Sequence, residues 1–208
     1  MKALLLIPTL FLLIGSQNKE GVAVKEAFEN YKKEILAGRG DEAVDYIDNT
    51  TIVYYEQVLD LALHASGDTL DKRSIIDRLN VYSARHRIAV ERMKAMSGRD
   101  FIVYAIDNGM IGKNSVAAIS IGDVSVDGTS ARGQALANGT PTPMYFVFNK
   151  EDGAWKVDLT SIFPITDGAL KKVVANSGLS EDEFIFKALE MVSGDAVADD
   201  IKEPLVPR

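Results

Sequence analysis

The most informative part of the chain is residues 116–159, which read VAAISIGDVSVDGTSARGQALANGTPTPMYFVFNKEDGAWKVDL. Apolar and β-branched residues recur here with a short period, as they do in half-buried strands. Asp127-Gly128 and Glu151-Asp152-Gly153 interrupt the pattern with residues that favour tight turns. The stretch predicts a four-strand antiparallel meander over residues 116–126, 131–136, 144–149 and 155–159. Pro141 and Pro143 are expected between strands, where a missing N–H donor does least harm.

Helical patterns flank this stretch on both sides. Before it, the spacing predicts a helix over residues 21–37, a short helix with Asp41 as its N-cap, and helices over residues 50–64 and 66–82. A capping box of Ser97 and Asp100 precedes residues 101–106, which suit a helix better than the alternative strand. After it, helices are expected over residues 166–176 and 180–193, the second with Ser180 and Glu183 as its capping box. This order predicts an α+β protein with N-terminal helices, a curved four-strand antiparallel sheet and C-terminal helices.

The end of the meander reads DGAWKVDL at residues 152–159. A D-G turn followed by alternating Trp155, Val157 and Leu159 gives a tight loop and then one buried face. This phrase and the layout resemble the nuclear-transport-factor-like or ketosteroid-isomerase-like cone fold, over roughly residues 21–165. The resemblance implies a single α+β cone-like domain over residues 17–195. It names no substrate, because the fold hosts isomerases, dehydratases, binding modules and inert scaffolds alike.

The first sixteen residues, MKALLLIPTLFLLIGS, have the pattern of a secretory signal peptide. Lys2 precedes an apolar run over residues 3–14 that is too short to span a membrane. Residues 13–16, LIGS, resemble the lipobox of bacterial lipoproteins, but Ser16 stands where that family has the lipid-bearing cysteine. Either Ser16 replaces a native cysteine, or this is an ordinary signal cleaved after Ser16. The resemblance favours the first and implies a protein of the bacterial cell envelope, lipid-anchored on the periplasmic side in its native form.

The C-terminal end differs in composition from the rest of the chain. Residues 196–204 are acidic and weakly apolar, which predicts a tail. Residues 205–208, LVPR, look like the remnant of a thrombin cleavage site. The formal charge of the chain is −7, and it becomes −9 without the two basic residues of the end segments, Lys2 and Arg208. So acidic a protein is not expected to coat nucleic acid or anionic lipid, and an absence of cysteine excludes disulfides, thiolate metal sites and a cysteine nucleophile.

One segment runs against this acidity. Residues 72–99 contain eight basic residues and two acidic ones, and Arg78, Arg85, Arg92 and Arg99 recur every seven positions. If most of this segment were one helix, the four arginines would form a stripe that could dock an acidic partner or phosphate groups. The alternative is a solvated helix face that is neutralised by the protein's own carboxylates, for example those of residues 181–183.

Few other residues are candidates for chemistry. By residue type, four could line a cone cavity: Tyr55, Tyr104, Asp107 and Asp158. None stands in a catalytic motif, and capping is the simpler role for Asp158. His64 and His86 lack metal-ligand spacing, so we expect no metal site, no cofactor and no assigned catalytic residue.

The sequence therefore predicts an exported, natively lipid-anchored envelope module that binds a protein partner and no nucleic acid. One specific version is an immunity or inhibitor protein whose acidic surface covers a basic toxin. The apolar N-terminal segment is also a candidate contact for self-association, because a dozen exposed apolar residues form a strong association patch. The alternative is a small-molecule carrier or an isomerase- or dehydratase-like enzyme that uses the cone cavity. A filled interior would favour the module, and an open cavity with a desolvated carboxylate would favour the enzyme.

Overall fold

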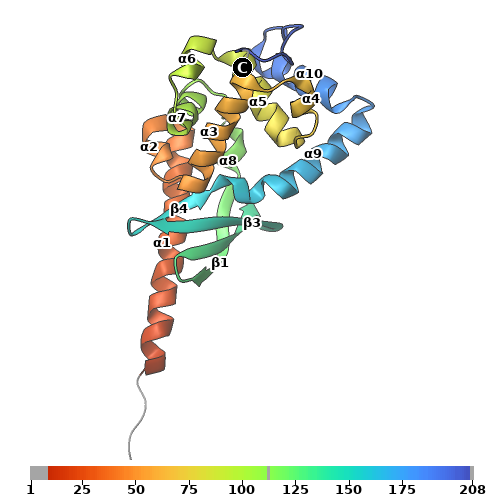
Figure 1. The fold of residues 1–208 in the computed structure, drawn as a ribbon. Coiled ribbons are helices and arrows are strands. Elements are labelled where there is room, and N and C mark those ends of the chain that lie inside the picture. The colour runs from red at the N-terminus through yellow and green to blue at the C-terminus, as the bar shows by residue number, and fades with distance from the viewer. Residues whose placement is uncertain (1–8, 112, 207–208) are drawn as a thin grey trace, which may run out of the picture.

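The computed structural model describes residues 9–111 and 113–206, with side chains from residue 19 onward except that of Ser115. Two groups of helices flank a single antiparallel sheet (Figure 1). The first group is α1 (Thr9–Ala37), α2 (Gly40–Val44), α3 (Asn49–His64), α4 (Gly67–Leu70), α5 (Ile75–Arg87), α6 (Val90–Lys94), α7 (Gly98–Asp107) and α8 (Asn114–Ala117). The sheet and second group are β1 (Ile119–Asp127), β2 (Ser130–Ala137), β3 (Thr140–Glu151), β4 (Ala154–Asp158), the 3-10 helix η1 (Leu159–Ile162), α9 (Phe163–Ser177) and α10 (Glu181–Ser193). The predicted α+β class and its element order are confirmed.

The sheet is an open, curved meander in the order β1-β2-β3-β4, with every neighbouring pair antiparallel. Two of its turns consist of two residues with positive φ: 49° and 77° at Asn138-Gly139, and 50° and 82° at Asp152-Gly153. Positive φ at both central residues is typical of the type I′ turn, whose twist matches that of the flanking strands. Asn and Asp tolerate this conformation at modest cost and Gly at none, so these dipeptides set the register of the sheet locally.

Part of the core lies between this sheet and α1, which crosses one face of the sheet (Figure 1). Phe28 of α1 is fully buried, and its ring centroid lies 5.1 Å from that of Phe146 and 6.5 Å from that of Phe148. Trp155 and Val157 of β4 are buried on the same side. Apolar residues at helical spacing on α1 therefore meet alternate residues of the strands, as the two periodicities require.

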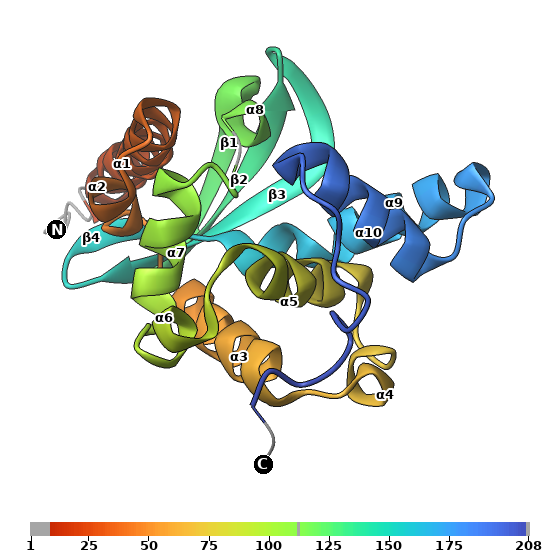
Figure 2. The same cartoon turned by 90° about the horizontal axis from the view of Figure 1, so that it is seen from above.

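A helical layer built on α3, α5 and α7 covers the other end of the molecule (Figure 2). Tyr55 of α3 stacks on Phe101 of α7 at 5.3 Å, and Tyr82 of α5 meets Phe186 of α10 edge-on at 5.3 Å. In contrast, α9 extends away from the body and buries only Val174 among its residues (Figure 2). The helical layer is thus anchored by α3, α5 and α7.

Several element boundaries differ from the predictions. Pro141 and Pro143 lie within β3 and not between strands. The single helix expected over residues 66–82 is divided into α4 and α5, because Ser74 caps a new helix by accepting from the N–H of Asp77 at 3.1 Å. Asp41 is not the N-cap of α2 that was expected: the cap is Arg39, the helix begins at Gly40, and Asp41 lies in its first turn. Residues 101–106 are helical, as favoured.

The acidic segment after α10 is not a free tail. Ile201 is 5% exposed, and the N–H of Val206 donates to the carbonyl of Leu63 at 2.8 Å. The segment predicted to be a signal peptide lies outside the described residues over 1–8 and in α1 from Thr9, where side chains including Ser16 are not described. In the described parts of the chain, no helix combines the length and apolarity needed to cross a membrane. Export and lipidation at position 16 remain predictions.

Candidate functional site

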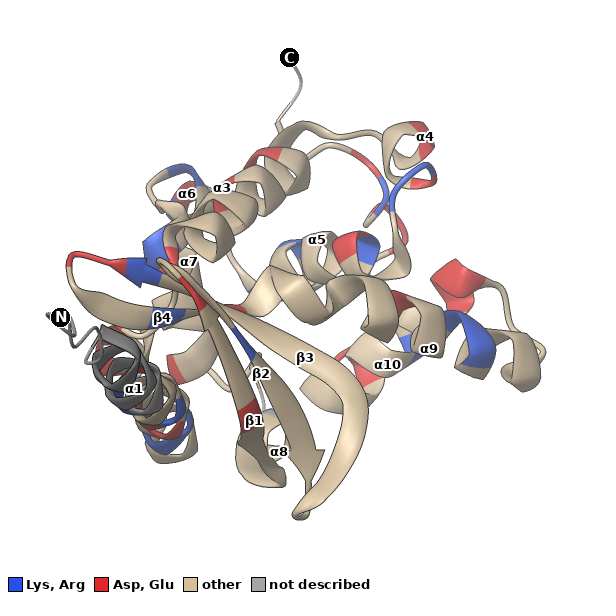
Figure 3. Ribbon diagram, turned by 90° about the horizontal axis from the view of Figure 1, so that it is seen from below, with Lys and Arg blue, Asp and Glu red and all other residues tan. Residues whose placement is uncertain are grey.

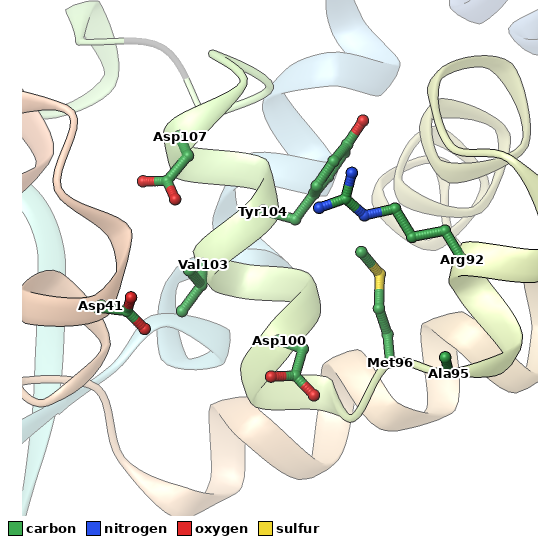
Figure 4. A pocket seen from close by; sticks show the side chains of 8 residues that line it. All are labelled: Asp41, Arg92, Ala95, Met96, Asp100, Val103, Tyr104 and Asp107. Atoms are coloured by element: carbon green, nitrogen blue, oxygen red, sulfur yellow. The ribbon is translucent and has the colours of Figure 1, made fainter.

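A groove of about 420 Å³ opens on the surface between α2, α6 and α7 (Figure 4). It brings together residues from distant parts of the sequence, and we call it the α7 groove. Its lining consists of Asp41, Arg92, Ala95, Met96, Asp100, Val103, Tyr104 and Asp107. Three of these, Arg92, Tyr104 and Asp107, are candidates from the sequence, which makes this groove the place where the predicted site residues converge best.

One face of α7 forms the floor of the groove. Asp100, Val103, Tyr104 and Asp107 are spaced i, i+3, i+4 and i+7, which places them in one row along a helix. The row begins at a capping box: Ser97 Oγ accepts from the N–H of Asp100 at 3.2 Å, and the Asp100 carboxylate accepts from Ser97 N–H at 2.9 Å. The cap fixes the first turn of α7 and with it the orientation of Asp100.

The second wall is α2, held against α7 by a close backbone approach. The N–H of Gly40 donates to Asp107 Oδ1 at 2.8 Å. A Cβ at Gly40 would lie 2.5 Å from the carbonyl oxygen of Val103, so only glycine permits this distance between the helices. The contact positions Asp41, the next residue, on the rim opposite α6 (Figure 4). Asp107 thus fixes the groove's shape and also lines it.

The third wall is α6, where Arg92 lies over Tyr104. The guanidinium carbon is 4.4 Å from the ring centroid, a cation–π geometry, and Figure 4 shows the two side chains facing each other. The Tyr104 hydroxyl donates to the carbonyl of Arg87 at 3.4 Å. Met96 adds an apolar, flexible surface beside them. This wall combines one positive charge with an aromatic face.

The groove therefore separates charges of opposite sign. Hydrogen bonds from the Ser97 hydroxyl and backbone N–H hold the pKa of Asp100 below its ordinary value, so this carboxylate is ionised at neutral pH. Asp41 and Asp107 lie on the side away from Arg92 (Figure 4). Such an arrangement can receive a cationic group at the carboxylates and an anionic or aromatic group at Arg92 and Tyr104. It contains no nucleophile–base pair that would define a covalent reaction.

The four arginines of the predicted stripe do not share a surface, because their segment forms three helices, α5, α6 and α7. Arg78 is 5% exposed and pairs with Glu181 and, at 2.7 Å, with Asp182. Arg99 pairs with Asp45 at 2.8 Å. The prediction that the four arginines form one docking stripe is therefore wrong. The alternative, neutralisation by the protein's own carboxylates, is correct for Arg78 and Arg99.

Arg85 has a different environment from the other three. Its side chain is buried, and it donates to the carbonyls of Ala62 at 2.8 Å, Leu61 at 3.2 Å and Ala65. These carbonyls belong to the last turn and the cap of α3, where helical N–H partners run out. That of Leu61 still accepts from the cap N–H of Ala65 at 2.9 Å. Arg85 therefore closes the C-terminus of α3, where a positive charge also complements the helix dipole.

The other two cavity candidates have structural roles. Tyr55 is buried against Phe101, and burial raises its pKa to about 12, so its hydroxyl is neutral and remains protonated. Asp158 caps η1 by accepting from the N–H of Thr160 at 2.9 Å and from its hydroxyl at 2.6 Å. This is the capping role that the sequence predicted as the simpler one. Neither residue lines the α7 groove.

The two histidines also contact structural partners. His86 Nε2 lies 2.8 Å from the Ser193 hydroxyl, and His64 Nδ1 lies 3.1 Å from the carbonyl of Val206. Within the described ranges, no three His, Cys, Asp or Glu residues are grouped so that they could hold a metal ion.

Sequence reasoning missed four of the groove residues that carry its chemistry and shape: Asp41, Met96, Asp100 and Val103. The i, i+3, i+4, i+7 spacing from Asp100 to Asp107 was a usable signal, since it begins at a recognisable capping box. Asp41 could not be found that way, because its place depends on the contact between α2 and α7.

Comparisons with known proteins found no match: no protein-family model, no curated protein and no solved structure matches the chain.

Proposed function

We propose that this protein is an exported cell-envelope binding module, natively lipid-anchored at position 16, and that its α7 groove receives part of a protein partner. A specific version is an immunity or inhibitor protein with a basic target. The domain is cone-like in this proposal, since an open curved meander with a long helix across one face suits the superfamily that residues 152–159 resemble. The proposal goes beyond fold, and the following observations support it.

The filled interior between α1 and the sheet carries the proposal. In a cone-like fold, a ligand cavity would lie on the face of the sheet that the helix covers. Here Phe28, Phe148 and Trp155 are 0%, 0% and 5% exposed, and Phe146 packs against them. Close-packed aromatic rings leave no room for a substrate there. Recognition on a surface groove therefore suits this molecule better than chemistry in an enclosed cavity.

The charge of the molecule supports a basic partner. With a formal charge of −7, the protein attracts a cationic protein from a distance and repels an acidic one. At close range, the ionised Asp100 together with Asp41 offers acceptors for lysine or arginine side chains. Tyr104, a residue type favoured at interface centres, and Met96 supply the apolar contact area.

A small ligand is the second candidate, and one observation favours it. The groove volume of about 420 Å³ falls within the range of small-molecule sites, roughly 300–1,000 Å³. A ligand with an ammonium group and an anionic or aromatic group would match its separated charges. Against this candidate, one oxygen of Asp107 is already committed to Gly40, so that carboxylate is only partly available.

The binding proposal is tested by pull-down from envelope extract with the full chain as bait. Asp41→Lys/Met96→Glu changes the groove without touching the cap or the Gly40 contact, and it should remove the partner. Asp123→Lys, on the exposed side of β1, is the control. It makes the same aspartate-to-lysine change outside the groove and should retain the partner. An unchanged partner set with the groove variant would exclude the groove as the binding site. Partner loss in both variants would point to net charge alone.

Lipid anchoring is tested separately. Ser16→Cys completes the lipobox, so cells that express this variant should incorporate labelled palmitate into it and retain it in the membrane fraction. The Ser16 chain is the control and should remain unlabelled. Failure of the cysteine variant to take up label would overturn the anchoring proposal and leave the binding proposal intact.

A further inference from the structure

A distinct surface is occupied by the protein's own C-terminal segment. After the left-handed cap at Gly194, the chain crosses α5 and ends against the last turn of α3 (Figure 2). We call residues 196–206 the strap; its last two residues belong to the segment that resembles a thrombin-site remnant. It contains no regular helix or strand, so its position depends on side-chain and backbone contacts with the body.

Two adjacent residues in the middle of the strap contact the body closely, and Val206 adds a backbone hydrogen bond near its end. The Ile201 side chain is 5% exposed, and its carbonyl accepts from Arg85 Nη1 at 2.8 Å. The ammonium of Lys202 donates to Asp71 at 3.0 Å and to Asp182 at 2.6 Å. An aliphatic side chain, a backbone carbonyl and a lysine are thus recognised in sequence, within a turned segment in which the N–H of Ile201 donates to the carbonyl of Ala198 at 3.1 Å.

The surface under the strap is organised by contacts that do not involve the strap. Arg85 is fixed by three carbonyls at the end of α3, and Asp182 is fixed by Arg78. Tyr82 is fully buried and its hydroxyl has no hydrogen-bond partner among the described residues. An unpaired buried hydroxyl costs free energy, so this surface retains a hydrogen-bonding group that the strap does not satisfy.

The charges of the strap are only partly matched by this surface, and acidic and basic residues both lie on α5 (Figure 3). Lys202 pairs with Asp71 and Asp182, and the Glu203 carboxylate favours the charged form of Arg85. Asp199 and Asp200 form no ion pair with another described residue. A segment with the same aliphatic–lysine pair and without these two carboxylates can therefore bind in the same place without losing a contact.

We infer that α4, α5 and the start of α10 form a receptor for a turned partner segment in which an aliphatic residue precedes a lysine, and that the strap fills this receptor in cis until such a segment displaces it. This goes beyond the α7 groove and does not depend on it. The strap then acts as a built-in competitor: it keeps Arg85 and Tyr82 covered and raises the threshold for a partner. The apparent affinity for the partner is the intrinsic affinity multiplied by the fraction of molecules in which the strap is open.

The test measures a labelled peptide against the full chain. The probe is a fluorescein-labelled peptide with the sequence of residues 196–206 in which both aspartates are replaced by asparagine. Ile201→Asp/Lys202→Glu in the full chain should release its own strap and bind the probe at least tenfold more tightly than the unsubstituted chain. The same two changes in the probe should abolish binding. Asp199→Ala in the full chain is the control on the strap, and it should leave both the strap position and the probe affinity unchanged.

Strap release is measured independently by hydrogen exchange of the Val206 amide, which is bonded to Leu63 in the closed form. Faster exchange in the double variant without tighter probe binding would overturn the receptor, and unchanged exchange would overturn the role of Ile201 and Lys202. If the double variant does not fold, Lys202→Met retains Ile201 and should bind the probe about threefold more tightly. Equal probe affinity for the Met variant and the unsubstituted chain would then refute the inference.

Discussion

At the scale of single residues, burial decides the role of a charge more than its spacing does. Arg85 and Arg92 occupy equivalent positions in a heptad pattern. Yet Arg85 is buried against backbone carbonyls, whereas Arg92 lies over the ring of Tyr104 in the α7 groove. Heptad spacing defines a common face only along a continuous helix, and the chain here breaks after Arg87 and again after Lys94. The heptad spacing was visible in the sequence, but the two helix ends that separate the arginines depend on tertiary packing.

Arg85→Met tests the role of the buried guanidinium. The substitution should lower the free energy of unfolding by about 3 kcal/mol, because it leaves carbonyls of α3 and the carbonyl of Ile201 without donors. Urea denaturation provides the measurement. Arg92→Met is the matched control and should cost at most about 1 kcal/mol, the value of an exposed cation–π contact. Equal losses in the two variants would contradict the capping role.

Gly40→Ala tests the close approach of α2 and α7. A methyl group there would meet the backbone carbonyl of Val103 at 2.5 Å, and backbone cannot rotate away as a side chain can. We expect a loss of at least about 2 kcal/mol in thermal or urea unfolding, together with altered groove geometry. Gly168→Ala on α9 is the control: nothing lies within 4 Å of its added Cβ, so it should stabilise the protein by up to about 1 kcal/mol. A neutral Gly40→Ala would show that the helices can separate freely.

At the scale of elements, local signals placed the helices and strands well, and distant contacts set their ends. Both predicted capping boxes, Ser97 with Asp100 and Ser180 with Glu183, are present. The start of α5 has a second partner that no local pattern reveals: Asp167, on α9, accepts from the N–H of Ile75 at 2.8 Å. A residue 92 positions away thus helps to divide the helix that the sequence pattern had joined.

The attachment of α1 to the sheet predicts a pH effect. Glu20 accepts from the indole N–H of Trp155 at 2.6 Å and from the Lys150 ammonium at 2.8 Å. The hydrogen bond from Lys150, followed by that from Trp155, lowers the pKa of Glu20. A lowered folded-state pKa means that this contribution to stability is present above the unfolded-state value, about 4.3, and is lost as the pH falls through the folded-state value.

Trp155, the single tryptophan, reports this titration by fluorescence. Its emission should change as the pH is lowered from 5 to 3, with a midpoint below about 4.3. Glu20→Gln should remove that transition, while Glu26→Gln, an exposed site on the same helix, should preserve it. An identical transition in the Glu20→Gln variant would assign the effect to another group.

At the scale of the whole molecule, the order of elements followed from the sequence, whereas the α7 groove and the strap did not. Turn dipeptides and alternating strands are local and define a meander without knowledge of the rest. The groove joins residue 41 to residues 92–107, and the strap joins residue 201 to residue 85, so both require the helices to be packed first. The two prolines are a further example: the role of Pro141 and Pro143 depends on the sheet edge on which they lie, and the sequence does not show that edge.

That edge exists because β4 pairs only with the later half of β3, from Val147 to Glu151. Ala137 and Thr140 close the two-residue turn, so the Thr140 N–H faces β2 and the backbone nitrogens of residues 141 and 143 face outward. Val147, which has the same parity, donates to Ser161 on that outer side at 3.1 Å. The two prolines therefore remove two donors from the unpaired half of the strand, which is how natural sheets block edge-to-edge pairing.

Pro141→Thr/Pro143→Thr should restore both donors and allow this edge to pair with a second copy of the chain. We expect sedimentation velocity to show concentration-dependent association beyond that of the unsubstituted protein, with urea unfolding changed by less than about 1 kcal/mol because both sites are exposed. Pro164→Thr, at the start of α9 and outside β3, is the control and should not associate further, because it restores no donor on the strand. If the double variant sediments like the unsubstituted protein at all concentrations, the prolines are not what protects this edge, and the cover must come from the neighbouring chain of η1 and α9.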